Sequence, residues 1–252
     1  MFERLRAARL IGPTLMTALG IAILLSLGAW QMHRKVWKEN LIAAIDQRTK
    51  AEPVELINAY TATRSPEEDA GIGLEYLRVK VSGHFLNGKE RYFYAPDPAL
   101  GSGVNVTTPF EITGGHQIVF VNRGFVPDRL KDPAARASGQ ITGETQVVGL
   151  VRQAGHQAHF VPDNDAQSNA WYWRDINALA KSAFPDGKTT VIPLIIDQET
   201  NATPGEGPKG GATIVALTNR HLEYAITWYG LALTLAAIFG VYALGRLRPT
   251  TG

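Results

Sequence analysis

The sequence predicts a membrane protein in which two transmembrane helices flank an α+β domain built mainly of antiparallel strands. Two long runs without a charged residue carry this prediction, together with the short alternating segments between them. The runs Leu10–Met32 and Tyr224–Gly245 each exceed the roughly 20 residues that a helix needs to cross a hydrocarbon core of about 30 Å. We therefore place transmembrane helices at residues 10–32 and 221–245, with the domain at residues 33–220 between them.

The first run has an alternative interpretation as a cleaved secretory signal, with Arg4, Arg6 and Arg9 as its basic region. However, the run is longer than the apolar part of a usual signal, and Leu27-Gly28-Ala29 is a poor cleavage site. A charged helical stretch also continues directly from it. We therefore favour a retained transmembrane helix, with Trp30 at headgroup depth.

The second run carries aromatic residues at both ends. Tyr224, Trp228 and Tyr229 lie near its start and Tyr242 near its end, as expected for residues at the two membrane interfaces. A buried core helix is the alternative, but the run is too long and too continuously apolar for that interpretation.

Two spans place both termini on one side of the membrane. The outer flanks carry basic residues, but the inner flanks also carry Arg34, Lys35, Lys38 and Arg220, so the charge bias is weak. We expect both termini in the cytoplasm and the large domain in the periplasm. The sequence starts almost directly with the span and shows no Arg/Ser-rich transit peptide, which favours a multi-pass protein of a bacterial cell inner membrane.

The middle domain is predicted to be rich in strands. Residues 35–49 extend the first helix, a polar linker follows to Gly71, and Ile176–Ala183 forms a short helix. Residues 201–211 form a loose loop. These elements favour an antiparallel sheet or a partial barrel. Alternating or β-branched patterns predict the strands: Tyr76–Phe85, Glu90–Ala95, Val104–Ile112, Gln117–Val126, Thr145–Arg152, Trp171–Asp175, Thr190–Asp197 and Thr213–Leu217.

The composition excludes several classes of function. The chain has no cysteine and only three scattered methionines, which argues against thiolate chemistry and against a Cu(I) carrier. No stretch interleaves basic and aromatic residues, so no nucleic-acid partner is expected. We also find no catalytic motif and expect a protein that is not an enzyme.

Three weak motifs have structural interpretations. Gly187-Lys188-Thr189 resembles the tail of a phosphate loop but lacks the earlier glycine, so we interpret it as a turn. His156 and His159 have the spacing of metal ligands without an evident third ligand. Asp163 and Asp165 lie in a polar loop and are interpreted as turn formers.

The segment Asn219-Arg220-His221 directly before the second run is the main candidate site. On a helix, His221, Tyr224, Ala225 and Trp228 follow a spacing that places them on one face. A neutral imidazole at the membrane surface beside aromatic side chains suits a haem iron. The alternative is a helix cap, with Asn219 as the capping residue and the aromatics as an interfacial belt. The residues alone favour the cap.

Five blocks spread along the chain resemble motifs of the surfeit locus protein 1 family. The match at the second span is the strongest, and Glu223 stands there where glutamine is common. Phe125 replaces a usual tryptophan. The blocks are Leu27-Gly28-Ala29-Trp30-Gln31-Met32-His33-Arg34, Val121-Asn122-Arg123-Gly124-Phe125-Val126-Pro127, Gly149-Leu150-Val151-Arg152, Asn169-Ala170-Trp171-Tyr172-Trp173-Arg174-Asp175 and Asn219-Arg220-His221-Leu222-Glu223-Tyr224-Ala225-Ile226-Thr227-Trp228-Tyr229-Gly230.

The resemblance implies an assembly factor for haem-copper oxidases of the cytochrome c (aa3) type, a chaperone of the respiratory chain. It implies transient binding of haem a and help with its insertion into oxidase subunit I, with His221 as the iron ligand. We expect Tyr224, Thr227 and Trp228 to line the site and Arg220 or Arg34 to meet the haem propionates. The expected partners are subunit I, the haem a synthase and the lipid bilayer.

Two other hypotheses remain open from the sequence. The chain could be a membrane scaffold that stabilises subunit I without carrying a cofactor. It could also be an anchored periplasmic enzyme, against which the missing nucleophile, metal ligands and carboxylate pair argue. The blocks in the middle domain could serve only to build strand ends and pack a core, or could form a docking face for the oxidase.

Overall fold

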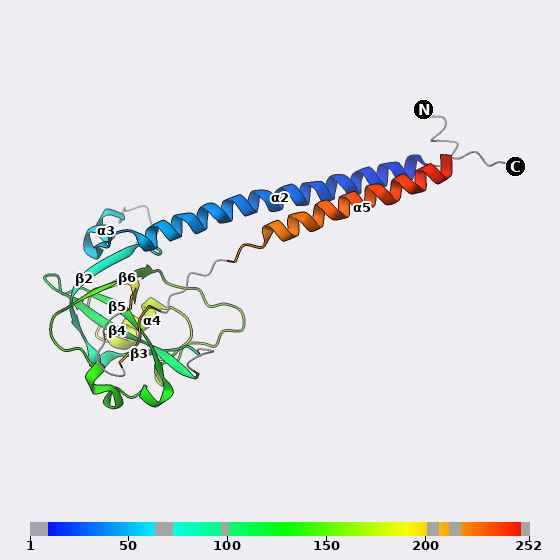
Figure 1. Cartoon of the computed structure of the whole chain (residues 1–252). Coiled ribbons are helices and arrows are strands. Elements are labelled where there is room, and N and C mark those ends of the chain that lie inside the picture. Colours follow the sequence, from blue (N-terminus) through cyan, green and yellow to red (C-terminus); the bar gives the residue numbers. More distant parts are fainter. Residues whose placement is uncertain (1–9, 64–72, 97–100, 201–206, 212–217, 248–252) are drawn as a thin grey trace. The chain divides into compact units, whose positions relative to one another are not determined.

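The computed structural model describes residues 10–63, 73–96, 101–200, 207–211 and 218–247. Its contacts divide the chain into two units, residues 1–44 with 216–252, and residues 45–215. The elements (Figure 1) are α2 (Ile11–Lys50), β1 (Val54–Glu55), α3 (Leu56–Thr63), β2 (Arg78–Phe85), η1 (Asn87–Lys89), β3 (Arg91–Tyr94), β4 (Gly103–Ile112), β5 (Ile118–Pro127), η2 (Asp128–Leu130), η3 (Pro133–Gly139), β6 (Thr145–Arg152), β7 (Ala170–Trp171), α4 (Ile176–Ala183), β8 (Val191–Gln198) and α5 (His221–Leu247).

The first unit contains two helices that are long and apolar enough to cross a membrane. α2 has 40 residues and α5 has 27. The apolar run of α2 and the charged stretch after it form one continuous helix to Lys50, as the sequence indicated. The predicted fold class, two transmembrane helices flanking a domain of strands and helices, is confirmed.

Small residues bring α2 and α5 together side by side (Figure 1). Gly28 of α2 and Ala225 and Ala232 of α5 are buried, whereas most large apolar side chains of both helices are exposed. A Cβ atom on Gly28 would lie only 2.5 Å from Cε1 of Tyr229, so glycine lets this ring rest on the α2 backbone. Close approach over small residues is typical of paired helices in membranes, and the exposed apolar surface suits lipid.

The second unit is built on one sheet in the strand order β1-β2-β6-β8-β5-β4-β3-β7. β2 also pairs with β4, so β2, β6, β8, β5 and β4 close into a barrel. Neighbours are antiparallel except for β1–β2, β5–β8 and β3–β7. β4 reaches both β3 and β2 because it has ten residues and shifts register between Val106 and Thr107, where an extra residue bends the strand.

Strand β8 is buried on both faces. Ile192, Leu194 and Ile196 of β8 belong to the main core, and Ile195 joins a second cluster with Trp171 and residues of α4. Successive side chains of a strand point to opposite faces, so this alternation divides β8 between the two cores. The barrel interior and the layer beneath α4 therefore both contain side chains of β8.

Four sequence predictions need correction or fall wholly or partly outside the described residues. The polar linker predicted after residue 49 is wrong in part, because β1 and α3 form there and Leu56 is fully buried in the main core. The strand predicted at Trp171–Asp175 is limited to Ala170–Trp171. The strand predicted at Thr213–Leu217 and the first part of the loop at residues 201–211 lie outside the described residues.

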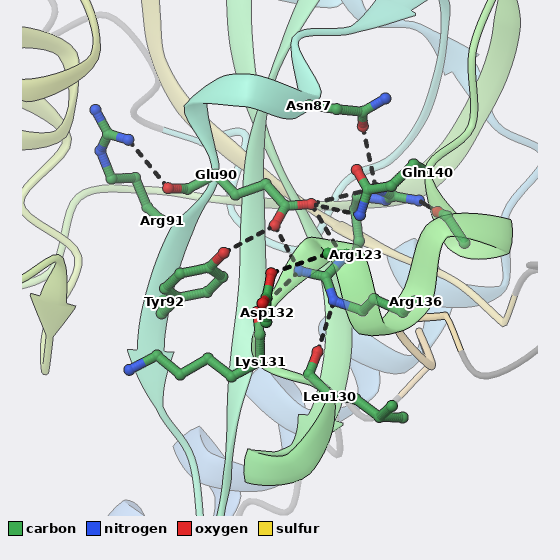
Figure 2. A network of polar contacts seen from close by, with 12 residues as sticks. Asn87, Glu90, Arg91, Tyr92, Arg123, Leu130, Lys131, Asp132, Arg136 and Gln140 are labelled. Atoms are coloured by element: carbon green, nitrogen blue, oxygen red, sulfur yellow. Dashed lines mark hydrogen bonds and ion pairs between the residues drawn. The ribbon is translucent and has the colours of Figure 1, made fainter.

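A buried ionic cluster lies at the start of β3 (Figure 2). The Glu90 carboxylate accepts hydrogen bonds from the Arg136 guanidinium at 3.1 and 2.5 Å and from the Tyr92 hydroxyl at 3.1 Å. Arg123 Nη1 lies 3.8 Å from Glu90 Oε1, and Arg123 Nη2 donates to the Gly139 carbonyl at 2.6 Å. The side chains of both arginines are 0% exposed and that of Glu90 is 2% exposed. Arg123 of the second sequence block therefore has a structural role in this buried cluster.

Candidate functional site

His221 is the first residue of α5 and is bonded to α2. Its Nδ1 atom lies 2.7 Å from Oε1 of Gln31, and both side chains are half-buried. The Asn219 side chain accepts a hydrogen bond from the His221 backbone N–H at 3.4 Å and donates to the Lys35 carbonyl at 3.5 Å. These two bonds are long and weak. Asn219 thus makes only weak contacts at the helix start, and the short bond to Gln31 exists beside them.

The bond to Gln31 fixes the chemistry of the imidazole. An amide oxygen only accepts hydrogen bonds, so Nδ1 of His221 must carry the proton and donate. In the neutral ring, Nε2 then holds the lone pair that can ligate a metal. Nε2 makes no hydrogen bond to any residue that the structure describes. Histidine ligands in metalloproteins are usually oriented in this way by a hydrogen bond from the second ring nitrogen.

The structure places the residues of the predicted helix face in two different environments. The residues of α5 packed against α2 include Ala225, which is 1% exposed, and Trp228 is half-buried. Tyr224 is 53% exposed, and Thr227 is exposed with its hydroxyl bonded to the Glu223 carbonyl at 2.9 Å. The packed seam follows steps of four and three residues from His221, so Tyr224 lies beside it. His221 therefore sits at the boundary between the packed seam and an aromatic, exposed flank.

The two candidate arginines have local partners. Arg220 Nη2 lies 3.0 Å from Glu223 Oε2, and both side chains are 64% exposed. The Arg34 guanidinium carbon lies 4.3 Å from the centre of the Trp37 ring. Neither arginine forms a hydrogen bond or ion pair with His221 among the described residues. Both cations are accessible to an anionic group, and the departure at Glu223 is balanced by the charge of Arg220.

Gln31 belongs to the first sequence block, and the sequence predicted no role for it. Its signal was its position, because it is a polar side chain at the inner end of a long apolar run. A half-buried polar side chain on a helix that packs against another helix usually has a hydrogen-bond partner. That partner is 190 residues away in the sequence, so only the folded helix pair could identify it.

Two of the weaker motifs lie in turns of the described part of the chain. Among the described residues, no group of three or more His, Asp or Glu side chains could hold a metal ion. Asp165 accepts hydrogen bonds from the Gln167 and Ser168 backbones, which confirms the turn interpretation. The Asp186 carboxylate likewise accepts from the Lys188 N–H in a tight turn.

Comparison with known proteins identifies the family. The SURF1 family matches residues 18–233. Surfeit locus protein 1 of Rattus norvegicus is 39% identical over 220 residues, which cover 81% of this chain and 67% of that protein. Surfeit locus protein 1 of Homo sapiens is 39% identical over 242 residues, 90% of this chain and 75% of that protein. A SURF1-like protein of Drosophila melanogaster is 32% identical over 223 residues, with 82% and 69% covered. The chain belongs to the SURF1 family.

Proposed function

We propose that this protein is an assembly factor for a cytochrome c oxidase, and that it carries haem a as a transient cargo to oxidase subunit I. Membership of the SURF1 family supports the assembly role. The role requires no catalytic group, since the cargo is bound and released unchanged. Binding must stay weak enough for release, because each factor of ten in affinity adds about 1.4 kcal/mol to the cost of transfer.

The observation that carries the haem proposal is the bond between His221 and Gln31. This bond holds the proton on Nδ1, so in the neutral ring the lone pair lies on Nε2, the nitrogen left open to ligate haem iron. A histidine that served only as a polar helix start would need no such fixed tautomer. The donor chemistry of the site therefore fits an iron porphyrin.

The surroundings of His221 supply the other groups that haem a needs. Tyr224, Thr227 and Trp228 would line the macrocycle, whose apolar faces suit the exposed apolar surface of the helix pair. Arg220 or Arg34 would pair with the propionates, since guanidinium groups bind carboxylates through two parallel hydrogen bonds. Ala225 is covered by the packed helices and would act only through their spacing.

We further propose that α2 and α5 hold the protein in a bacterial inner membrane, with the strand-rich domain in the periplasm and both termini in the cytoplasm. Haem a would then reach subunit I within the outer leaflet. The haem a synthase is a candidate donor, because a carrier must receive its cargo from the enzyme that makes it.

The proposal is tested by the haem content of the detergent-purified full chain from cells that make haem a. The Soret absorption per protein is compared between wild type, His221→Ala and the matched control His33→Ala, an exposed histidine of α2. We expect His221→Ala to lose the haem signal and His33→Ala to keep it. Equal haem content in wild type and His221→Ala would rule out His221 as the ligand.

Gln31→Leu tests the carrying observation separately. Loss of a hydrogen bond that orients a ligand histidine typically weakens metal binding by 10–100-fold, so haem a should dissociate faster from this variant. Unchanged dissociation and an unchanged Soret position would show that the Gln31 bond is structural. Capture of subunit I by a chain without haem would instead favour the scaffold function.

A further inference from the structure

The strand-rich domain contains a cavity that the proposed haem site does not use. It has a volume of about 490 Å³ and is lined by β3, β4, β5, β6, β8 and the loop before α4. Cavities of roughly 300–1,000 Å³ are the usual size of ligand sites. Three of the sequence blocks contribute lining residues, which include Asn122, Arg152 and Arg174. Asn122 of β5 and Arg152 of β6 lie near each other because β8 lies between these two strands in the sheet, and Arg174 comes from the loop before α4.

A close backbone approach shapes one wall of the cavity. Phe125 of β5 exchanges two backbone hydrogen bonds with Lys209, at 3.1 and 3.0 Å. Gly124 has a φ of +107° at this point, and a Cβ atom there would collide with the Lys209 carbonyl. Glycine is therefore required at this position of the wall. The requirement comes from the close approach of the Lys209 backbone and not from packing of the core.

Three lining residues, Asn122, Arg152 and Asp197, belong to an ionic network that also includes Glu75. Arg152 donates to Glu75 at 3.0 Å and to Asp197 at 2.9 Å, and Asn122 donates to Asp197 at 2.9 Å. Each carboxylate is thus bonded to Arg152. These contacts are partly buried, so the network is held rigidly and the charges of Glu75 and Asp197 are engaged.

Arg174 differs from Arg152 because it has no carboxylate bonded to it. Its Nε donates to the Gln153 carbonyl at 3.2 Å, and its remaining N–H groups make no hydrogen bond to the described residues. Burial, followed by the neighbouring charge of Arg152, lowers the pKa of Arg174, and the charges of Asp197 and Glu75 oppose this shift only in part. A guanidinium in these surroundings gains from an incoming anion, and its two outer nitrogens match the two oxygens of a carboxylate.

The rim of the cavity offers aromatic surface. The rings of Tyr94 and Tyr172 lie with their centres 6.1 Å apart, and the residues are 60% and 39% exposed. Exposed tyrosines beside an arginine are typical of surfaces that bind peptides and proteins.

Trp173 Nε1 and Gln198 Oε1, from two lining residues, are buried without a hydrogen bond within the described residues. Such atoms are rare in native proteins and lower stability.

We propose that this cavity binds an acidic peptide segment, whose carboxylate pairs with Arg174 while a neighbouring apolar side chain rests on Tyr94 and Tyr172. The segment belongs to a partner protein and supplies a glutamate or aspartate side chain. This site is independent of haem binding, because it uses none of the residues around His221.

The test uses the full chain in detergent, labelled with 5-fluorotryptophan and observed by fluorine NMR. Trp173 lines the cavity and is one of five tryptophans, so Trp173→Phe assigns its signal. The probes are the capped peptides acetyl-Phe-Glu-Phe-amide and acetyl-Phe-Gln-Phe-amide, and glutarate. The variants are Arg174→Gln, Arg174→Lys and the matched control Lys188→Gln, whose side chain is exposed outside the cavity.

We expect the Glu peptide to shift the Trp173 signal saturably in wild type and in Lys188→Gln. Binding should weaken about tenfold or more in Arg174→Gln, as expected for a lost charged hydrogen bond, and less in Arg174→Lys. Glutarate that binds as tightly as the peptide would overturn the peptide partner and assign the site to a small carboxylate. An equal shift by the Gln peptide, unchanged binding in Arg174→Gln with a native-like spectrum, or no shift by any probe at millimolar concentration would overturn the proposal.

Discussion

Removing the negative charge of Glu90 should destabilise the strand-rich domain severely. Glu90→Gln keeps the shape of the side chain but leaves the guanidinium groups of Arg136 and Arg123 buried without a counter-charge. Breaking a buried ion pair by removing one partner costs about 3–5 kcal/mol. A domain of this size is stable by only about 5–15 kcal/mol, so the variant should lose a large fraction of its stability.

The lowered pKa of Arg123 also indicates that Glu90→Gln should lose several kcal/mol of the free energy of unfolding. Burial lowers this pKa from the ordinary value of an arginine to about 10; the charge of Glu90 opposes that shift, and the charge of Arg136 adds to it. At about 1.4 kcal/mol per pKa unit, keeping Arg123 charged already costs on the order of 3 kcal/mol with Glu90 present. Without Glu90, two desolvated cations would remain beside each other and this cost would rise.

The assay is urea unfolding of the full chain in mild detergent, followed by the tryptophan fluorescence, to which the buried Trp171 contributes, and extrapolated to water. The matched control is Glu55→Gln, which removes a surface carboxylate 3.4 Å from Lys80 and should change stability by about 0–1 kcal/mol. A loss below about 1 kcal/mol in Glu90→Gln would refute the charge explanation. Glu90→Met combined with Arg136→Met should recover part of the loss, because it removes one buried cation.

Two further predictions concern the same domain. Burial and the charge of Glu90 raise the pKa of Tyr92 to about 12, so the unfolded chain releases this proton first and stability should fall as pH rises from about 10 to 12. Denaturation of Tyr92→Phe across this window should show a flatter decline than wild type, and identical declines would contradict the assignment. Gly124→Ala should destabilise the domain by at least about 1–3 kcal/mol, because alanine is strained at this φ and meets the Lys209 carbonyl. Denaturation equal to wild type would show that the wall at Lys209 can move.

The local sequence predicted the elements whose signals are local. The two apolar runs predicted α2 and α5 because the length and composition of a span are read from consecutive residues. α4 was predicted with its observed bounds, since Asp175 caps the first turn by accepting from the Ala178 N–H. The alternation of β8 likewise predicted a strand. β1 and α3 were missed, because the packing of Leu56 into a distant core is not visible in the polar sequence around it.

By itself, the sequence determined the class of this protein, two membrane helices around a strand-rich domain, and it singled out His221 as the residue to examine. Tertiary structure alone decided which polar groups meet: His221 with Gln31 across 190 residues, Arg136 with Glu90 across 46, and Arg152 with Asp197 across 45. Hydrophobic periodicity is repeated along the chain and can be read locally. A hydrogen bond or ion pair joins two particular atoms, and nothing near either residue specifies its partner until the fold brings them together.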